Sequence, residues 1–162
     1  MTKKIAVFSS GRGGNFNNIC EYFSNTENIS IDLLVTTNLD SMSKKIADKN
    51  KIESVYADTS VLQSGNLSST MIRKNIDLIV LAGFLLKIPK KLINQYEKKI
   101  INLHPSLLPR FGGKGMYGDN VHRAVLRSGD PVTGITIHYV DEVYDNGEIV
   151  FQKGCNIDPE EG

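Results

Sequence analysis

The chain has 162 residues, which is enough for one domain with its own core and short for two. Apolar residues make up 40% and charged residues 23% of the sequence, values that exclude wholesale disorder and fibrous repeats. Nineteen basic and eighteen acidic residues leave a formal charge of +1. We therefore expect no strong attraction to nucleic acid or to a membrane surface.

The apolar runs and the cysteines bear on membrane insertion and on the redox environment. The longest apolar run, residues 78–86, is far shorter than the roughly 20 residues that cross a bilayer, and we expect no signal peptide. The two cysteines, Cys20 and Cys155, are far apart and form no CxxC pair. This usage favours a reduced chain in the cytoplasm.

The first two thirds of the chain alternate between apolar runs and stretches with helical spacing. The apolar runs predict strands at residues 5–8, 31–35, 54–57, 78–82 and 100–103. Helical faces are predicted by the apolar residues at 16, 19, 20 and 23, at 67, 71 and 72, and at 92, 93 and 96. Such alternation is typical of βαβ units. We predict an α/β fold with a single doubly wound, mostly parallel sheet, resembling a Rossmann fold.

The pattern changes after Leu103. A loop rich in Gly and Pro covers residues 105–118, and residues 120–127 have helical spacing. Two more strands are predicted at residues 134–139 and 149–155, with an acidic turn between them. Because no linker or repeat interrupts the chain, we predict one domain over residues 1–162.

A glycine-rich loop, Ser9 to Asn15, separates the first predicted strand from the first helix. Glycines let a backbone approach an anion closely, and helix N-terminal N–H groups are unpaired donors for phosphate. The third glycine of a dinucleotide fingerprint is replaced by Phe16, and no Walker A lysine follows. The loop therefore favours a single phosphate group over a dinucleotide, and a plain tight turn is the alternative.

Asn102 and His104 lie at the end of the fifth predicted strand, two residues apart, so their side chains share one face. The carboxyl end of a parallel strand is where open α/β sheets bind ligands. An amide N–H can stabilise an oxyanion, and an imidazole exchanges protons near neutral pH. A carboxylate to orient His104 could come from Asp141, Glu142 or Asp145, and spacing does not choose among them.

These motifs occur together in one family. The glycine loop, Leu81–Phe84, Asn102–Pro109, Gly112–Gly118, Val121-His122 and Asp145–Gly147 follow in this order. The chain closely resembles the phosphoribosylglycinamide formyltransferases, the folate-dependent enzymes of purine synthesis, over essentially its whole length. The string from Asn102 to Pro109 marks the wider formyltransferase family, and the glycine loop and residues 113–118 point to the glycinamide branch.

The resemblance implies roles for particular residues. Gly13, Gly14 and Asn15 match the segment that binds the ribonucleotide phosphate. Asn102, His104 and Asp145 match the catalytic residues. The folate pocket corresponds to Asn102 and to two loops, namely Leu85, Leu86, Lys87 and Ile88, and Asp141, Glu142, Val143, Tyr144 and Asp145. Many relatives carry arginine where this chain has Leu86, so a guanidinium is lost there while backbone contacts are kept.

The implied reaction is transfer of the formyl group of 10-formyltetrahydrofolate to the amine of 5'-phosphoribosylglycinamide, by direct attack and a tetrahedral intermediate, in de novo purine (IMP) biosynthesis. Formyl folate is then a co-substrate, and the partners are small molecules, with no nucleic acid and no membrane. His104, His122 and His138 lack ligand spacing, so we expect no metal. His138 fits a packing role behind the site, and the chain is expected to be a monomer or homodimer.

Two alternatives remain at this point. The acceptor could be an amino sugar nucleotide or methionyl-tRNA, although enzymes of those kinds usually carry a further domain. The chain could also be a non-catalytic module that binds a phosphorylated metabolite. The sequence ends before a helix that contributes to the ribonucleotide site in the family. We therefore expect either a fragment or an incomplete acceptor site.

Overall fold

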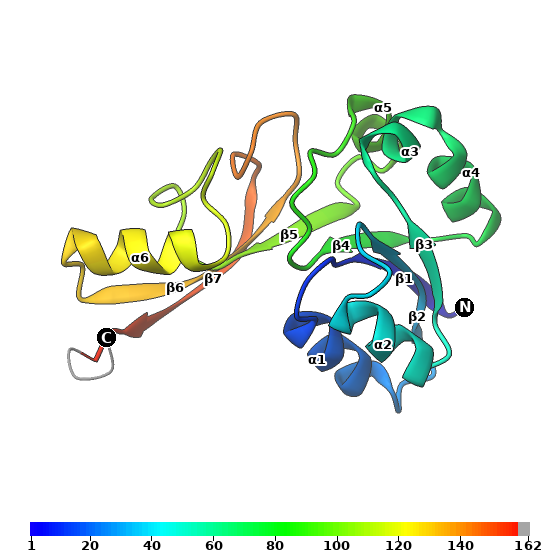
Figure 1. The fold of residues 1–162 in the computed structure, drawn as a ribbon, viewed down its shortest axis with the longest axis horizontal. Coiled ribbons are helices and arrows are strands. Elements are labelled where there is room, and N and C mark those ends of the chain that lie inside the picture. Colours follow the sequence, from blue (N-terminus) through cyan, green and yellow to red (C-terminus); the bar gives the residue numbers. More distant parts are fainter. Residues whose placement is uncertain (159–162) are drawn as a thin grey trace. The chain divides into compact units, whose positions relative to one another are not determined.

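The computed structural model describes residues 1–158. Its strands are β1 (Lys3–Phe8), β2 (Ile29–Thr36), β3 (Glu53–Tyr56), β4 (Leu78–Leu81), β5 (Ile100–His104), β6 (Val132–Tyr139) and β7 (Ile149–Asn156) (Figure 1). Its helices are α1 (Gly14–Phe23), α2 (Met42–Lys49), α3 (Thr59–Ser64), α4 (Asn66–Arg73), α5 (Lys90–Gln95) and α6 (Asp119–Ser128). The strand order is β3-β2-β1-β4-β5-β6-β7, which confirms the predicted class of a mostly parallel α/β sheet. The chain divides into two compact units at the start of β5, after Ile100.

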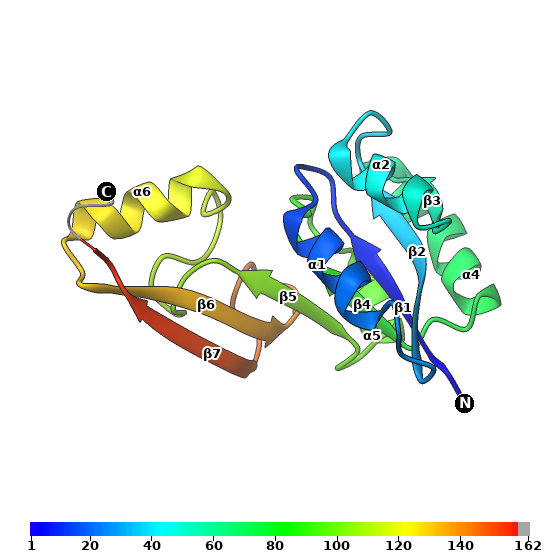
Figure 2. The ribbon, with the colours of Figure 1, turned by 90° about the horizontal axis from the view of Figure 1, so that it is seen from below.

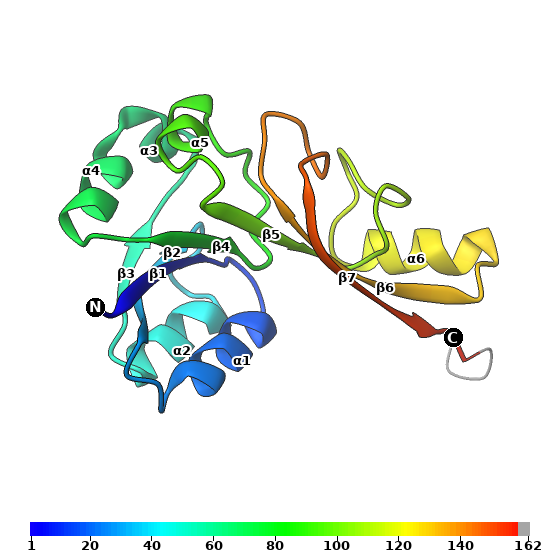
Figure 3. The ribbon, with the colours of Figure 1, turned by 180° about the vertical axis from the view of Figure 1, so that it is seen from behind.

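The first unit, Met1–Ile100, contains the parallel part of the sheet. Strand β1 pairs in parallel with β2 and β4, and β2 pairs in parallel with β3. Helices α1 and α2 cover one face of these strands, and α3, α4 and α5 lie on the other (Figures 1 and 3). Because both faces are covered, four consecutive residues of β1, Ile5 to Phe8, are all buried.

The core on the α1 and α2 side contains the helical face that the sequence predicts. Phe16 and Cys20 of α1 are buried there, together with Val7 of β1 and Leu34 of β2. Local polar contacts set where some helices begin. The Ser41 hydroxyl accepts a hydrogen bond from the Lys44 N–H at the start of α2.

One predicted helical face needs correction. In α4, Leu67 and Met71 are buried as expected, whereas Ile72 is 59% exposed. At about 100° per residue, position 72 lies some 140° around the helix from position 67, beyond the buried stripe. Ser68 takes the remaining buried position instead.

The second unit begins at Ile101 and contains an antiparallel arrangement of β5, β6 and β7. Helix α6 lies along β6 and β7 (Figure 2) and buries Val121 and Val125. Strand β7 forms as predicted, but all eight of its residues are exposed, including Val150 and Phe151. Pairing with β6 therefore stabilises this strand more than side-chain burial does.

Candidate active site

The glycine loop of the first unit leads directly into α1. Gly13 is the N-cap of α1 with a left-handed φ of 72°, and Gly14 and Asn15 are the first helical residues. No side chain caps this helix N-terminus, so its first N–H groups stay available for an anion. Gly14 and Asn15 are exposed, and Gly13 is buried.

Packing explains why position 13 must be glycine. A β-carbon there would lie 2.8 Å from Cδ1 of Ile46 and 3.1 Å from the Cα of Ser43, both in α2. A side chain would also strain the positive φ. The loop pattern predicts glycine here so that a phosphate can approach the backbone. Close contact with α2 is a second, independent reason for glycine at this position.

The stretch from Leu85 to Ile88 follows β4 as a loop before α5. Leu85 is 54% exposed and Lys87 is exposed, whereas Ile88 is only 4% exposed. The Ile88 side chain therefore belongs to the core of the first unit. What this loop can offer a ligand is its backbone and the side chains of Leu85 to Lys87.

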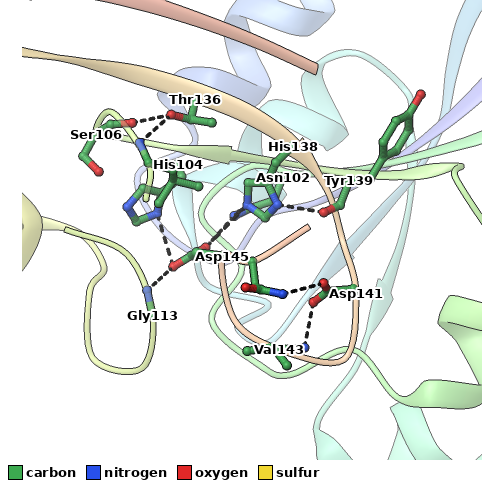
Figure 4. A network of polar contacts seen from close by, with 12 residues as sticks. Asn102, His104, Ser106, Gly113, Thr136, His138, Tyr139, Asp141, Val143 and Asp145 are labelled. Carbon is green, nitrogen blue, oxygen red and sulfur yellow. Dashed lines mark hydrogen bonds and ion pairs between the residues drawn. The ribbon is translucent and has the colours of Figure 1, made fainter. Parts of the chain in front are cut away.

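The second unit brings Asn102, His104 and Asp145 together (Figure 4). Asn102 Nδ2 donates to Asp145 Oδ1 at 3.2 Å, and His104 Nδ1 lies 3.5 Å from Asp145 Oδ2. His104 is 3% exposed and the Asp145 side chain 10%. Of the three carboxylates left open by the sequence, Asp145 is the one that contacts His104.

The proton positions on His104 follow from its other contact. Its Nε2 lies 2.8 Å from the carbonyl oxygen of Phe111, and a carbonyl only accepts, so Nε2 carries a hydrogen. Nδ1 is then the nitrogen that gains and loses a proton, and it faces Asp145. Neutral His104 presents a lone pair there, and protonated His104 presents an N–H donor.

Asp145 is ionised in this environment. Burial raises the pKa of the Asp145 carboxyl, but the His138 imidazole, the Gly113 N–H and the charge of His104 together lower that pKa below its usual value. The Gly113 N–H donates to Asp145 Oδ2 at 2.9 Å. Asp145 and Phe111 both adopt a left-handed φ of 55°, a strained conformation that recurs at functional sites.

Asp141 in the same acidic turn has a different position. Its carboxylate accepts from the Val143 N–H at 2.7 Å and from the Asn146 side chain at 3.1 Å, which stabilises the turn itself. Glu142 is exposed, and Val143 and Tyr144 are 60% and 42% exposed. These two apolar side chains are the surface that this loop can present to a flat aromatic ligand.

Several residues around the triplet were not predicted as site residues. His138, Gly113 and Phe111 all contact the triplet, and His138 is 2% exposed. The antiparallel register explains His138, since β6 places it directly opposite Asn102 and places Thr136 opposite His104. The sequence predicts that positions 136 and 138 lie on one face of the strand, because side chains alternate along it. It does not predict the register, which depends on how β5 and β6 pair.

Neither a candidate metal cluster nor a candidate membrane-spanning helix occurs in the part of the chain that the structure describes. Residues 1–158 contain no cluster of three or more His, Cys, Asp or Glu side chains that could hold a metal ion. No helix in this part of the chain has the length and apolar character needed to cross a membrane.

Comparison with known proteins gives formyltransferases as relatives. Residues 3–162 match the family model described as formyl transferase. Phosphoribosylglycinamide formyltransferase of Bacillus subtilis is 36% identical over 96% of this chain and 80% of its own length. The chloroplastic phosphoribosylglycinamide formyltransferase of Arabidopsis thaliana is 41% identical over 96% of this chain and 56% of its own length.

A solved phosphoribosylglycinamide formyltransferase from Anaplasma phagocytophilum superposes with a TM-score of 0.88 at 29% identity, over 99% of this chain and 75% of that one. The chain spans about half the length of the plant relatives. The family match and the Bacillus subtilis relative together show that this chain belongs to the formyl transferase family, in the branch of the phosphoribosylglycinamide formyltransferases.

Proposed function

We propose that this chain, as one formyltransferase domain over residues 1–162, transfers a formyl group from 10-formyltetrahydrofolate to the amine of 5'-phosphoribosylglycinamide, a step of purine biosynthesis. The observation that carries the proposal is the contact of Asn102 and His104 with the ionised carboxylate of Asp145. The printed names of the relatives support this acceptor, and one partial relative is a trifunctional purine biosynthetic protein.

The two substrates are assigned to separate segments. Gly13, Gly14 and Asn15 bind the ribonucleotide phosphate through the uncapped N–H groups of α1. The folate is bound by Asn102 and by the loops at 85–88 and 141–145, mainly through backbone groups and the exposed apolar side chains of Leu85, Val143 and Tyr144. Leu86 contributes no charge to this binding.

In the proposed reaction, the neutral amine of the ribonucleotide attacks the formyl carbon, and the carbonyl electron pair moves onto oxygen. The Asn102 amide and protonated His104, through its Nδ1–H, stabilise that oxyanion. Asp145 and water take the proton from the attacking nitrogen. The tetrahedral intermediate then collapses and the bond to folate N10 breaks. N10 takes up the proton that Asp145 and water had received, so tetrahydrofolate leaves and Asp145 is ionised again. The cycle uses neither a metal nor a covalent enzyme intermediate.

We also propose that the protein works as a monomer or homodimer in the cytoplasm, without a nucleic-acid or membrane partner. The net charge of +1 supports the absence of nucleic acid. The chloroplastic names of two plant relatives define the competing compartment. Light scattering of the purified chain and imaging of the tagged full-length protein test these two points.

The deciding experiment supplies 10-formyltetrahydrofolate with one acceptor at a time and follows the formylated product by mass. We expect product from phosphoribosylglycinamide and none from an amino sugar nucleotide or methionyl-tRNA. The Asp145→Asn variant is the catalytic control for background transfer. Preferred transfer to another acceptor would reassign the substrate, and folate or phosphate binding without transfer to any acceptor would indicate a binding module.

A further inference from the structure

His138 is a buried imidazole with a partner on each ring nitrogen. It is 2% exposed and lies on β6 opposite Asn102. Its Nδ1 is 2.8 Å from the carbonyl oxygen of Tyr139, and its Nε2 is 3.1 Å from Asn102 Nδ2 (Figure 4). Nε2 also lies 3.5 Å from Asp145 Oδ1. The ring is therefore held between the backbone of its own strand and the amide of Asn102.

These contacts decide which nitrogen of neutral His138 carries the hydrogen. The Tyr139 carbonyl only accepts, so the hydrogen is on Nδ1 and the lone pair is on Nε2. Asn102 Nδ2 donates one of its two hydrogens to that lone pair and the other to Asp145 Oδ1. Both donors of the amide are thus directed by acceptors that are themselves fixed.

A carboxamide has a donor end and an acceptor end of nearly the same size, so its orientation depends on its neighbours. The Nε2 lone pair excludes the reversed orientation, in which Asn102 Oδ1 would face another acceptor. Asp145 favours the same orientation, but in the proposed reaction it takes up a proton, and a neutral carboxyl group is a weaker acceptor for the amide. The Nε2 lone pair of neutral His138 is available to the amide whether or not Asp145 is protonated.

We propose that His138 is a positioning residue whose Nδ1–H tautomer keeps the donor end of the Asn102 amide turned toward Asp145, where the oxyanion forms. This role rests on the proposed formyl transfer, because only an oxyanion requires the donor end. The hydrogen that now points to Asp145 is the one that the oxyanion takes, and the other stays on His138.

Gly147 leaves room for the Tyr139 carbonyl, the group that accepts the hydrogen bond from His138 Nδ1. A β-carbon at Gly147 would overlap the carbonyl oxygen of Tyr139 and would lie 3.6 Å from His138 Nδ1. The turn after Asp145 can therefore close over the Tyr139 peptide only with glycine at this position. In the preceding peptide, the Tyr139 N–H donates to the Glu148 carbonyl at 2.9 Å, which ties Tyr139 to the residue before β7.

The first test reads the tautomer without any substrate. The full chain is labelled with ¹⁵N-histidine, and the His138 resonances are assigned by their loss in His138→Gln. We expect neutral His138 to show a protonated Nδ1 and an unprotonated Nε2. A spectrum with the hydrogen on Nε2 would overturn the proposal, whatever the enzyme catalyses.

The second test separates positioning from folding. A glutamine at 138 can place Oε1 near the position of Nε2 as an acceptor, whereas a leucine of similar volume cannot. We expect His138→Leu to lower kcat about 10–100-fold with KM values nearly unchanged, and His138→Gln to recover most of kcat. His122→Leu, at an exposed histidine of α6, is the matched control with unchanged kcat. Melting curves verify that each variant is folded.

The third test asks whether His138 acts through Asn102. In an Asn102→Ala background, His138→Leu should cause little further loss of kcat, because the amide that it orients is gone. Full multiplication of the two losses, or equal losses in the Leu and Gln variants, would overturn the positioning role. If the wild-type chain transfers no formyl group, the proposed function is wrong. The spectrum still tests, independently of activity, whether His138 is the Nδ1–H tautomer.

Discussion

Asp145 is held by groups that each favour its charged form. The Gly113 N–H and Asn102 Nδ2 donate to its two oxygens, and His104 Nδ1 lies 3.5 Å away. In the proposed reaction this carboxylate receives the proton of the attacking amine, so its loss is expected to affect turnover more than folding.

The Asp145→Asn variant should therefore fold normally and turn over roughly 10²–10⁴-fold more slowly. His104→Ala should have a similar effect, and the double variant should lose much less than the product of the two losses, because the residues act as a unit. Steady-state kinetics with circular dichroism measure both effects. Near-normal turnover in a folded Asp145→Asn protein would remove Asp145 from the mechanism.

Cys20 offers a separate prediction about stability. Burial raises the pKa of the Cys20 thiol to about 11, with a smaller contribution from Glu21, from an ordinary value of 9.0. The unfolded chain ionises this thiol first, so its contribution to stability is present below pH 9 and is lost as the pH rises toward 11. The shift corresponds to about 2–3 kcal/mol at the upper limit.

Denaturant unfolding of the wild type and of Cys20→Ala between pH 8 and pH 11 measures this contribution. Other groups titrate in that range, so the difference between the two proteins is the quantity of interest. We expect the wild type to lose more stability than the variant. The exposed Cys155 is the control, and Cys155→Ala should follow the wild type.

At the scale of elements, the connection between β1 and α1 contains two adjacent glycines, of which Gly13 packs against α2 and Gly14 is part of the proposed phosphate site. Gly13 is confined by α2 and has a φ of 72°, whereas a β-carbon at Gly14 would meet nothing within 4 Å. The two positions can therefore be separated by experiment.

Gly13→Ala should lower the free energy of unfolding by about 1–3 kcal/mol, from the left-handed φ and the contact with Ile46. Gly14→Ala should leave the melting temperature unchanged and weaken binding of the ribonucleotide about tenfold, because the methyl group stands among the N–H donors of α1. Gly11→Ala, where a β-carbon also meets nothing within 4 Å, is the control. Unchanged ribonucleotide affinity in a folded Gly14→Ala protein would contradict the phosphate assignment.

The antiparallel pairing of β5 and β6 positions two of the three proposed catalytic residues, Asn102 and His104. It sets Asn102 against His138 and His104 against Thr136. Thr136 Oγ1 donates to the Ser106 carbonyl at 2.6 Å and accepts from the Leu108 N–H at 3.0 Å. The loop after His104 is thereby tied to β6, and the Phe111 carbonyl that holds His104 belongs to that loop.

At the scale of the molecule, the residues proposed for phosphate binding and those proposed for the chemical step belong to different units. The phosphate loop belongs to the first unit, and Asn102, His104 and Asp145 belong to the second. Variants in the two units should therefore affect different kinetic constants.

We expect Gly14→Ala to raise the KM for the ribonucleotide with kcat nearly unchanged, and Asp145→Asn to lower kcat with the KM for the ribonucleotide nearly unchanged. The double variant should combine the two effects multiplicatively, because one acts on binding and the other on the chemical step. Initial-rate measurements over both substrates give kcat and both KM values for each protein. Strong non-additivity would mean that the phosphate loop takes part in the chemical step.

The sequence alone was sufficient for the α/β class, for the seven strands and for the family, because apolar periodicity and short motifs are local properties. It placed Asn102 and His104 on one face for the same reason. Spacing left Asp141, Glu142 and Asp145 open, the family resemblance singled out Asp145, and the tertiary structure showed its contact with His104. Finding His138 behind Asn102 and explaining Gly13 and Gly147 also required the tertiary structure. Strand register, loop closure and helix contacts decide these points, and they arise between residues that lie far apart along the chain.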